Sequence, residues 1–251
     1  MSKQSISIMA LLGVPIIEHE DNIADIILKT LETSNIQLLD GDLIIIAHTI
    51  VSKSEGRVVH GDEVSISGRA KEIAERNGFD PVQVELALRE GKEVIRSEGA
   101  LITETRTGLV CNFSGVDRSN APKDSYVLLP ENPDRSARNI LRKMTNATGV
   151  NLGIIITDTQ GRPWRKGSVN LAIGSAGINA FKRNRGKQDL YGRTLRSSTV
   201  CQVDELAASA EPLMGQADEG IPIVIIRDYE YEDGSERSRD VPRPKSEDLF
   251  R

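Results

Sequence analysis

Three short apolar runs constrain the fold of this chain more than any other feature of its sequence. They occupy residues 43–47, 153–157 and 221–226, and each consists mostly of isoleucine, leucine or valine. Runs of this length without polar alternation are typical of strands buried in a sheet, and they are far too short to cross a bilayer. Because aromatic residues make up only 4% of the sequence, the core must be built mainly from aliphatic side chains.

The rest of the chain shows helical and strand-like patterns that do not alternate strictly. Helices are expected at residues 22–31, 67–77, 82–95, 134–145 and 204–213, and further strands at residues 5–12, 100–104 and 109–112. Gly78 is expected to end the second helix, and Asp134 to cap the start of the fourth. This mixture favours an α+β fold over a doubly wound one. Neither the Rossmann glycine motif nor the P-loop motif occurs, so any nucleotide has to be held in another way.

Charge and cysteine content argue against several classes of protein. The formal net charge is −5, so a broad nucleic-acid-binding face is not expected. The two cysteines, Cys111 and Cys201, stand in no CxxC or Cys/His cluster, which argues against a disulfide framework or a structural zinc site. The N-terminal residues lack the long apolar stretch and cleavage site of a signal peptide. We therefore expect a cytoplasmic protein that binds neither membrane nor nucleic acid.

The strongest chemical feature is the segment that follows the second apolar run. Asp158 and Thr159 come directly after that run, and Arg162 and Arg165 follow a glycine turn. A carboxylate and a hydroxyl at the end of a strand can coordinate a hard divalent cation, and arginines can neutralise phosphate oxygens. The alternative interpretation is that Asp158 caps a turn and that both arginines are solvated.

Three other segments next to apolar runs carry similar groups. Asp117 follows a short strand and a glycine, although an Asx-turn explains its position equally well. Lys53 lies shortly after the first long run and can reach a phosphate, whereas His48 on its own is more often structural. Residues 214–222 form a small-residue loop whose glycines let backbone N–H groups approach a phosphate, unless the loop is a plain connection closed by a C-cap glycine. Together these segments supply the groups of a metal–phosphate site.

At these segments the chain resembles the coenzyme F420:L-glutamate ligase family, also called F420-0:gamma-glutamyl ligase. The resemblance runs over nearly the whole chain and rests on long motifs in the same order. These motifs are the DGD block that leads to EGR at residues 40–57, RAKEIA at 69–74, GVDRSN at 115–120, TDTQGRPWR at 157–165, KQDLYGR at 187–193, DELAASAEPLMGQ at 204–216 and the C-terminal EDLFR at 247–251.

The resemblance implies a fold, partners and cofactors. It implies a two-domain α+β fold within one ligase domain at residues 1–251, an intertwined homodimer, and the stand-alone archaeal form of the family. It also implies GTP as co-substrate, two divalent cations (manganese or magnesium), and potassium as a helper ion.

The resemblance also assigns roles to residues of this chain. The metal ligands are expected to be Asp117, Asp158, Thr159 and Gln216. The catalytic residues are expected to be Asp117, Asp158, Arg162 and Arg165. The contacts to GTP are expected at Val14, Pro15, Ile16, Ile17, His48, Thr49, Lys53, Asn120, Met214, Gly215, Gln216, Ala217, Asp218, Glu219, Gly220 and Ile221.

The implied chemistry needs no protein nucleophile. GTP phosphorylates the terminal carboxylate of the coenzyme F420 precursor, and GDP is released. The amine of L-glutamate then attacks the resulting acyl phosphate and displaces phosphate. Further γ-linked glutamate can then be added. Two alternatives use the same groups, namely a metal-dependent phosphohydrolase or nucleotidase, and a catalytically silent nucleotide-binding protein.

Overall fold

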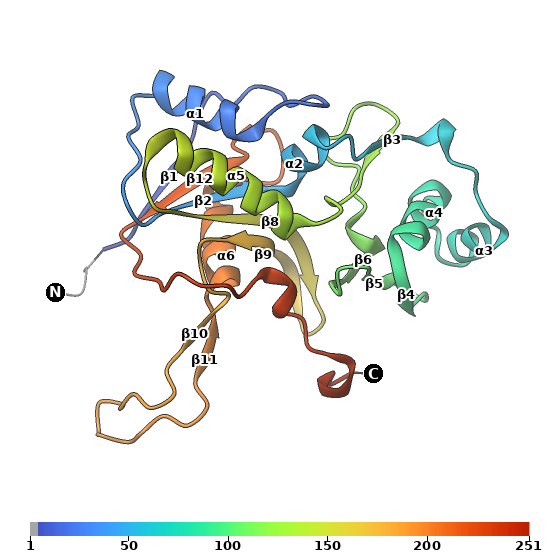
Figure 1. Cartoon of the computed structure of the whole chain (residues 1–251). Helices are drawn as coiled ribbons and strands as arrows, with labels where there is room; N and C mark the ends of the chain where they lie inside the picture. The colour runs from blue at the N-terminus through green and yellow to red at the C-terminus, as the bar shows by residue number, and fades with distance from the viewer. Residues whose placement is uncertain (1–4, 251) are drawn as a thin grey trace.

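The centre of the protein is a five-stranded mixed sheet with helices on both faces (Figure 1). The computed structural model describes residues 5–250, so Arg251 of the C-terminal motif and the first four residues of the predicted ligase domain lie outside it. In spatial order, the strands are β1 (Ser7–Ala10), β12 (Ile223–Arg227), β2 (Asp42–Ala47), β8 (Leu152–Arg162) and β9 (Arg165–Ala176).

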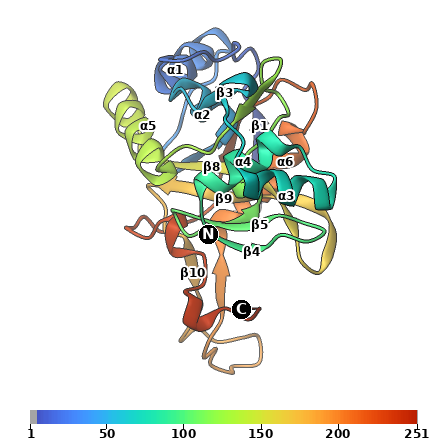
Figure 2. The ribbon, with the colours of Figure 1, turned by 90° about the vertical axis from the view of Figure 1, so that its right-hand side faces the viewer.

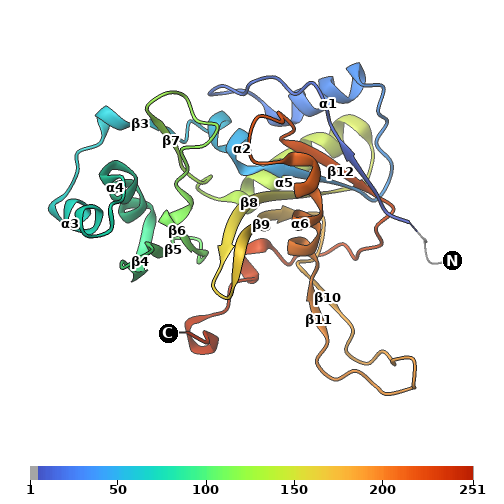
Figure 3. The ribbon, with the colours of Figure 1, turned by 180° about the vertical axis from the view of Figure 1, so that it is seen from behind.

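Both faces of this sheet are buried, as the apolar runs predict. Ile44, Ile154 and Ile225 point to one face, where α1 (Ile23–Thr33) and α5 (Pro133–Thr148) cover them. Neighbouring residues of the same strands, such as Ile45 and Ile155, point to the other face and pack against α6 (Gln202–Met214). Figures 1 and 3 show α1 and α5 on the side of the sheet opposite to α6. The three buried strands are therefore confirmed.

Strand pairing brings distant parts of the chain to one edge of the sheet. Strands β2 and β8 are parallel, with Ala47 opposite Thr157, so the C-terminal ends of their apolar parts lie at the same edge of the sheet. Strand β12 is antiparallel to β2 and enters at that edge, where the Ala47 N–H donates to the Pro222 carbonyl at 2.9 Å. The chain that follows β1 leaves there too, because the Leu11 N–H donates to the Ile223 carbonyl at 3.0 Å.

A second region, within residues 58–128, has its own apolar cluster around buried residues such as Val84, Leu101 and Leu128. Its elements are β3 (Val58–His60), α3 (Gly68–Asn77), α4 (Pro81–Glu90), β4 (Gly91–Arg96), β5 (Ile102–Thr105), β6 (Val110–Asn112) and β7 (Ser125–Val127), with short 3-10 helices at Gly61–Glu63 and Phe113–Gly115. This region lies to one side of the main sheet in Figures 1 and 3. The sequence-based division into two domains stays a prediction.

A long hairpin extends away from the body of the protein in all three ribbon views (Figure 2). It is built on the paired strands β10 (Phe181–Arg183) and β11 (Thr199–Cys201), and its outer part exposes Leu190 and Tyr191 fully. The C-terminal segment carries 3-10 helices at Ser238–Asp240 and Lys245–Glu247. No helix in residues 5–250 combines the length and the apolar character needed to cross a membrane.

Two sequence-based expectations about helices are wrong. The helix expected at residues 82–95 ends at Glu90, and the chain continues as β4 because residues from Gly91 onward pair with β5. Asp134 does not cap α5; Asn132 does, with Pro133 in the first turn. Asp134 instead points inward and accepts the backbone N–H of Ser175 at 2.9 Å.

The other predicted helices and strands are present, with ends that differ by a few residues, and Gly78 ends α3 in the left-handed conformation. A short helix, α2 (His48–Ser54), was not predicted, because seven residues are too few to show a clear helical period.

Candidate active site

A cavity of about 2410 Å³ lies at the sheet edge where these segments meet. Its walls come from the chain after β1, from α2, from the segment around Asp117, from β8 and from the loop after α6. All residues to which the sequence analysis assigned a site role line this cavity, except Arg165 and Asp218. Segments more than a hundred residues apart in the sequence therefore share one wall.

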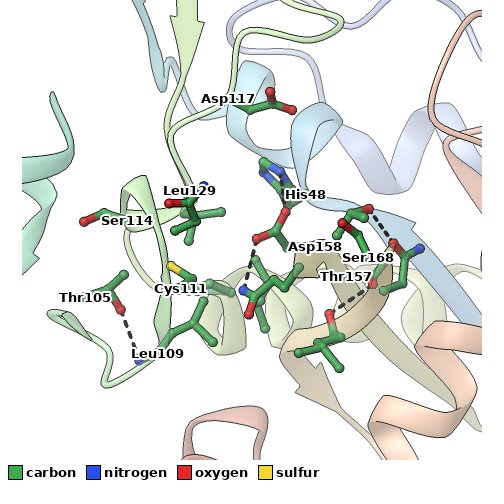
Figure 4. A pocket seen from close by; sticks show the side chains of 18 of the residues that line it. His48, Thr105, Leu109, Cys111, Ser114, Asp117, Leu129, Thr157, Asp158 and Ser168 are labelled. Carbon is green, nitrogen blue, oxygen red and sulfur yellow. Dashed lines mark hydrogen bonds and ion pairs between the residues drawn. The ribbon is translucent and has the colours of Figure 1, made fainter. Parts of the chain in front are cut away.

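Asp158 is held inside the cavity by two neighbours. His48, the first residue of α2, is buried and places Nε2 3.3 Å from Asp158 Oδ1. Gln160 donates from Nε2 to Asp158 Oδ2 at 3.2 Å. Figure 4 shows Asp158 next to His48, with Cys111 to one side. The parallel pairing of β2 and β8 explains the contact, because His48 follows Ala47 and Asp158 follows Thr157 at the same edge.

The position of Asp158 within β8 differs from the sequence-based expectation. The strand does not end at Thr157 but continues to Arg162, because its polar half pairs with β9. The pairing shifts register between Ile156 and Thr157, which is where the apolar half of the strand gives way to the polar half. Gln160 was missed as a site residue, although a spacing of two places it on the same strand face as Asp158.

Thr159 and Gln216 meet across the cavity. Gln216 lies in the loop after α6 and donates from Nε2 to Thr159 Oγ1 at 2.8 Å. The structure thus brings together two of the four predicted metal ligands, which lie 57 residues apart in the sequence.

Asp117 occupies an Asx-turn, which is the alternative that its sequence context left open. Its carboxylate accepts the backbone N–H groups of Arg118 at 2.6 Å and Ser119 at 2.9 Å, and the Ser119 hydroxyl at 2.6 Å. Asp117 lines the same cavity as Asp158. Across residues 5–250, no three His, Cys, Asp or Glu side chains form a ready metal-binding group. Any cation here would depend on two carboxylates together with hydroxyl and amide oxygens, a hard donor set of the kind that magnesium and manganese prefer.

Lys53, Asn120 and the loop after α6 form a continuous wall. Lys53, in the last turn of α2, donates from Nζ to the Asn120 carbonyl at 2.6 Å. Asn120 donates in turn from its side-chain amide to the Ala217 carbonyl at 3.3 Å. Burial lowers the pKa of the Lys53 ammonium. The structure therefore brings together three segments that the sequence analysis assigned to nucleotide binding, while the role itself stays a prediction.

The two predicted catalytic arginines lie away from this wall. Arg162 and Arg165 pair across the tip of the β8–β9 hairpin, and the Arg162 guanidinium donates to the Lys166 carbonyl at 3.0 Å. Arg162 lies four positions beyond Asp158 along the strand, which corresponds to roughly 13 Å. The tip lies beside the C-terminal segment, where the rings of Trp164 and Phe250 are 5.3 Å apart. A catalytic role for these arginines stays a prediction.

Comparison with known proteins shows what the chain resembles. Residues 12–228 match the family model described as F420-0:Gamma-glutamyl ligase. A relative from Methanothermobacter thermautotrophicus, named coenzyme F420:L-glutamate ligase, is 45% identical over 251 residues, covering 98% of this chain and 99% of the relative. A relative with the same name from Methanopyrus kandleri is 46% identical, covering 92% of this chain and 92% of the relative. Another from Methanocaldococcus jannaschii is 47% identical, covering 84% of this chain and 85% of the relative.

The conformation of Gly215 generates a testable prediction about the loop. Its backbone has φ 66° and ψ −177°, and a Cβ there would lie 2.1 Å from the Glu219 carboxyl carbon. That carboxylate accepts the Ala217 N–H at 2.8 Å, so an added methyl group would also disturb the loop. We expect Gly215→Ala to lower the free energy of unfolding by about 1–3 kcal/mol in urea titrations.

Gly220→Ala is the matched control, because Gly220 has the same positive φ but open space where a Cβ would stand. Gly220→Ala should lower the free energy of unfolding by less than Gly215→Ala does. The double variant Gly215→Ala with Glu219→Ala should regain part of the stability that Gly215→Ala loses. Equal losses of unfolding free energy in the two glycine variants would show that the contact with Glu219 does not contribute to the destabilisation.

Proposed function

The chain belongs to the F420-0:gamma-glutamyl ligase family, whose members form amide bonds, and from this premise we propose that it joins L-glutamate to the coenzyme F420 precursor at the expense of GTP. The observation that supports this proposal is the convergence of five separate segments on one cavity, where they supply carboxylates, an ammonium group, a hydroxyl and side-chain amides. Such a site can hold two anionic substrates side by side.

The proposed reaction has two steps. The γ-phosphoryl group of GTP passes to the carboxylate of the precursor, which forms an acyl phosphate and GDP. The glutamate nitrogen then attacks the acyl carbon, so that a C–N bond forms while the C–O bond to phosphate breaks and the amine gives up a proton. The same steps, repeated on a γ-carboxylate, would add further γ-linked glutamate.

No covalent step through the protein is part of this proposal. Cys111 lines the cavity, but burial and, to a lesser extent, the charge of Asp158 raise the pKa of its thiol. The thiol therefore stays protonated near neutral pH, and direct transfer between bound substrates is favoured over a thiolate nucleophile.

We assign the proposed divalent cations, manganese or magnesium, to Asp117, Asp158, Thr159 and Gln216. When bound, such a cation neutralises phosphate charge and reduces repulsion between the anionic reactants. His48 and Gln160 hold the Asp158 carboxylate in place, and the Asx-turn does the same for Asp117. Potassium as a helper ion and a cytoplasmic location stay predictions.

Replacement of Asp158 tests the proposed reaction. We expect purified protein given GTP, L-glutamate, the coenzyme precursor and Mn²⁺ to make GDP and a product heavier by one glutamyl unit, read by mass spectrometry. Asp158→Asn keeps the size of the side chain but removes its charge, so turnover should fall by about 100-fold or more. Asp25→Asn, an exposed surface change on α1, should leave turnover unchanged.

Three results would contradict the proposal in different ways. GDP formed without glutamate or precursor would indicate a phosphohydrolase or nucleotidase, and GTP binding without GDP would indicate a silent nucleotide-binding protein. Near-normal turnover of Asp158→Asn would remove Asp158 from the proposed metal ligands.

Lys53 is proposed to contact the phosphates of GTP. An ammonium that makes a charged hydrogen bond in a partly dry site contributes roughly 1.5–3 kcal/mol, so Lys53→Ala should weaken GTP binding by that amount in calorimetric titrations with Mn²⁺. Lys53→Arg should recover little, because a planar guanidinium does not replace a compact ammonium. Melting temperatures report whether loss of the Asn120 contact has disturbed the fold. Identical GTP affinities for wild type and Lys53→Ala would move the phosphate site elsewhere.

We propose that the protein is a homodimer and that its long hairpin contributes to the interface. The hairpin exposes Leu190 and Tyr191, two large apolar side chains that a second copy would bury. Light scattering at micromolar concentration should give twice the mass of one chain, and replacing both residues by serine should shift the mass toward one chain. A fully active protein with the mass of a single chain would refute the dimer.

A further inference from the structure

Glu211 lies in the last turn of α6 and lines the cavity; it falls within the motif at residues 204–216, but the resemblance assigned it no role. We propose that Glu211 is a positioning residue that turns the Gln216 side chain so that its carbonyl oxygen is available to a divalent cation. This inference rests on the metal-dependent reaction proposed above and adds to it a residue outside the predicted ligand set.

The hydrogen bonds of the Gln216 amide determine which way its side chain faces. Its Nε2 donates to Glu211 Oε1 at 2.5 Å and to Thr159 Oγ1 at 2.8 Å, so both amide hydrogens are used. An ionised carboxylate can only accept, so the nitrogen must face Glu211 and cannot exchange places with the oxygen. The carbonyl oxygen of Gln216 is consequently turned away from Glu211.

The same chain of hydrogen bonds orients Thr159. Its hydroxyl donates to Asn170 Oδ1 at 2.6 Å while accepting from Gln216, which leaves one lone pair of Oγ1 without a partner in this network. Asn170 is buried and its amide points to the Met214 sulfur at 3.7 Å, so its own orientation is determined as well. Both predicted ligands, Thr159 and Gln216, thus have their hydrogens engaged elsewhere, as cation coordination requires.

The second oxygen of Glu211 supports the proposal independently. Oε2 is buried, and none of the described residues donates a hydrogen bond to it. Leaving a buried charged acceptor unsatisfied is unfavourable, and such groups in native proteins call for an explanation. A cation bound at the neighbouring Gln216 oxygen would offset that cost through its charge.

Mn²⁺ affinity, measured by electron paramagnetic resonance titration of the full chain, tests the proposal without relying on activity. Glu211→Gln keeps the size of the side chain but no longer dictates which way the Gln216 amide faces. Changes to residues that orient a metal ligand weaken metal binding by about 10–100-fold, and we expect a loss in that range. Glu205→Gln is the matched control, because it removes the same charge from an exposed position on the same helix and should leave Mn²⁺ affinity unchanged.

An exchange variant tests whether a ligand oxygen at position 216 restores cation binding when the net charge is kept. Glu211→Gln combined with Gln216→Glu leaves the charge of the site unchanged and restores a hydrogen bond of reversed direction between the two side chains. It places carboxylate oxygens where the Gln216 carbonyl was, so Mn²⁺ affinity should return to at least the wild-type value. If Glu211→Gln does not fold, as judged by its melting curve, Glu211→Asp decides the question. It keeps the charge but is too short to reach the Gln216 amide, so Mn²⁺ affinity should again fall, and wild-type affinity in Glu211→Asp would overturn the proposal.

The outcomes distinguish this inference from the proposed function. Wild-type Mn²⁺ affinity in Glu211→Gln, or an exchange variant that folds but does not recover affinity, would overturn the role of Glu211 while the ligase reaction of the wild type could still stand. A wild-type protein that forms no glutamylated product would overturn the proposed function, whatever its Mn²⁺ affinity. A wild type that forms the product but binds no Mn²⁺ would overturn the metal assignment and the role of Glu211 together.

Discussion

The parallel pairing of β2 with β8 is the constraint on which the rest of the site depends. It places Ala47 opposite Thr157, so the residues that follow them, His48 and Asp158, lie side by side. Parallel strands usually occur in sheets whose two faces are both covered, and here α1, α5 and α6 provide that cover. The aliphatic core and the polar cavity are therefore two consequences of one arrangement.

The polar side chains at this edge are held by partners within the protein. His48 and Gln160 contact Asp158, three donors satisfy Asp117, and Lys53 donates to the Asn120 carbonyl. Fixed partners reduce the conformational entropy that binding would otherwise cost. The exception is Glu211, whose Oε2 has no partner among the described residues and whose other oxygen contacts the proposed cation ligand Gln216.

Local sequence patterns predicted helices and strands well where burial alone determines which side chains are allowed. Apolar runs identified the buried strands, because polar side chains cannot be placed there without large desolvation costs. The patterns failed where tertiary pairing competes with local preference. Residues 91–95 continue a helical pattern but pair with β5 instead, and the polar half of β8 extends to Arg162 only because β9 lies beside it. The cap of α5 was misplaced because Asp134 is recruited by a distant backbone group, that of Ser175.

The sequence by itself determined the family and the strand cores, because long ordered motifs and apolar runs can be recognised without knowing which segments meet. Local context also made Asp158 and Thr159 candidate ligands, and the resemblance added Gln216. Only the tertiary structure decided which of these groups touch, since hydrogen bonds such as that between Gln216 and Thr159 join residues far apart in the chain. Glu211 lies within one of these motifs, but its position in the sequence assigned it no role, because that role depends on the direction of one amide, which contacts across the cavity determine.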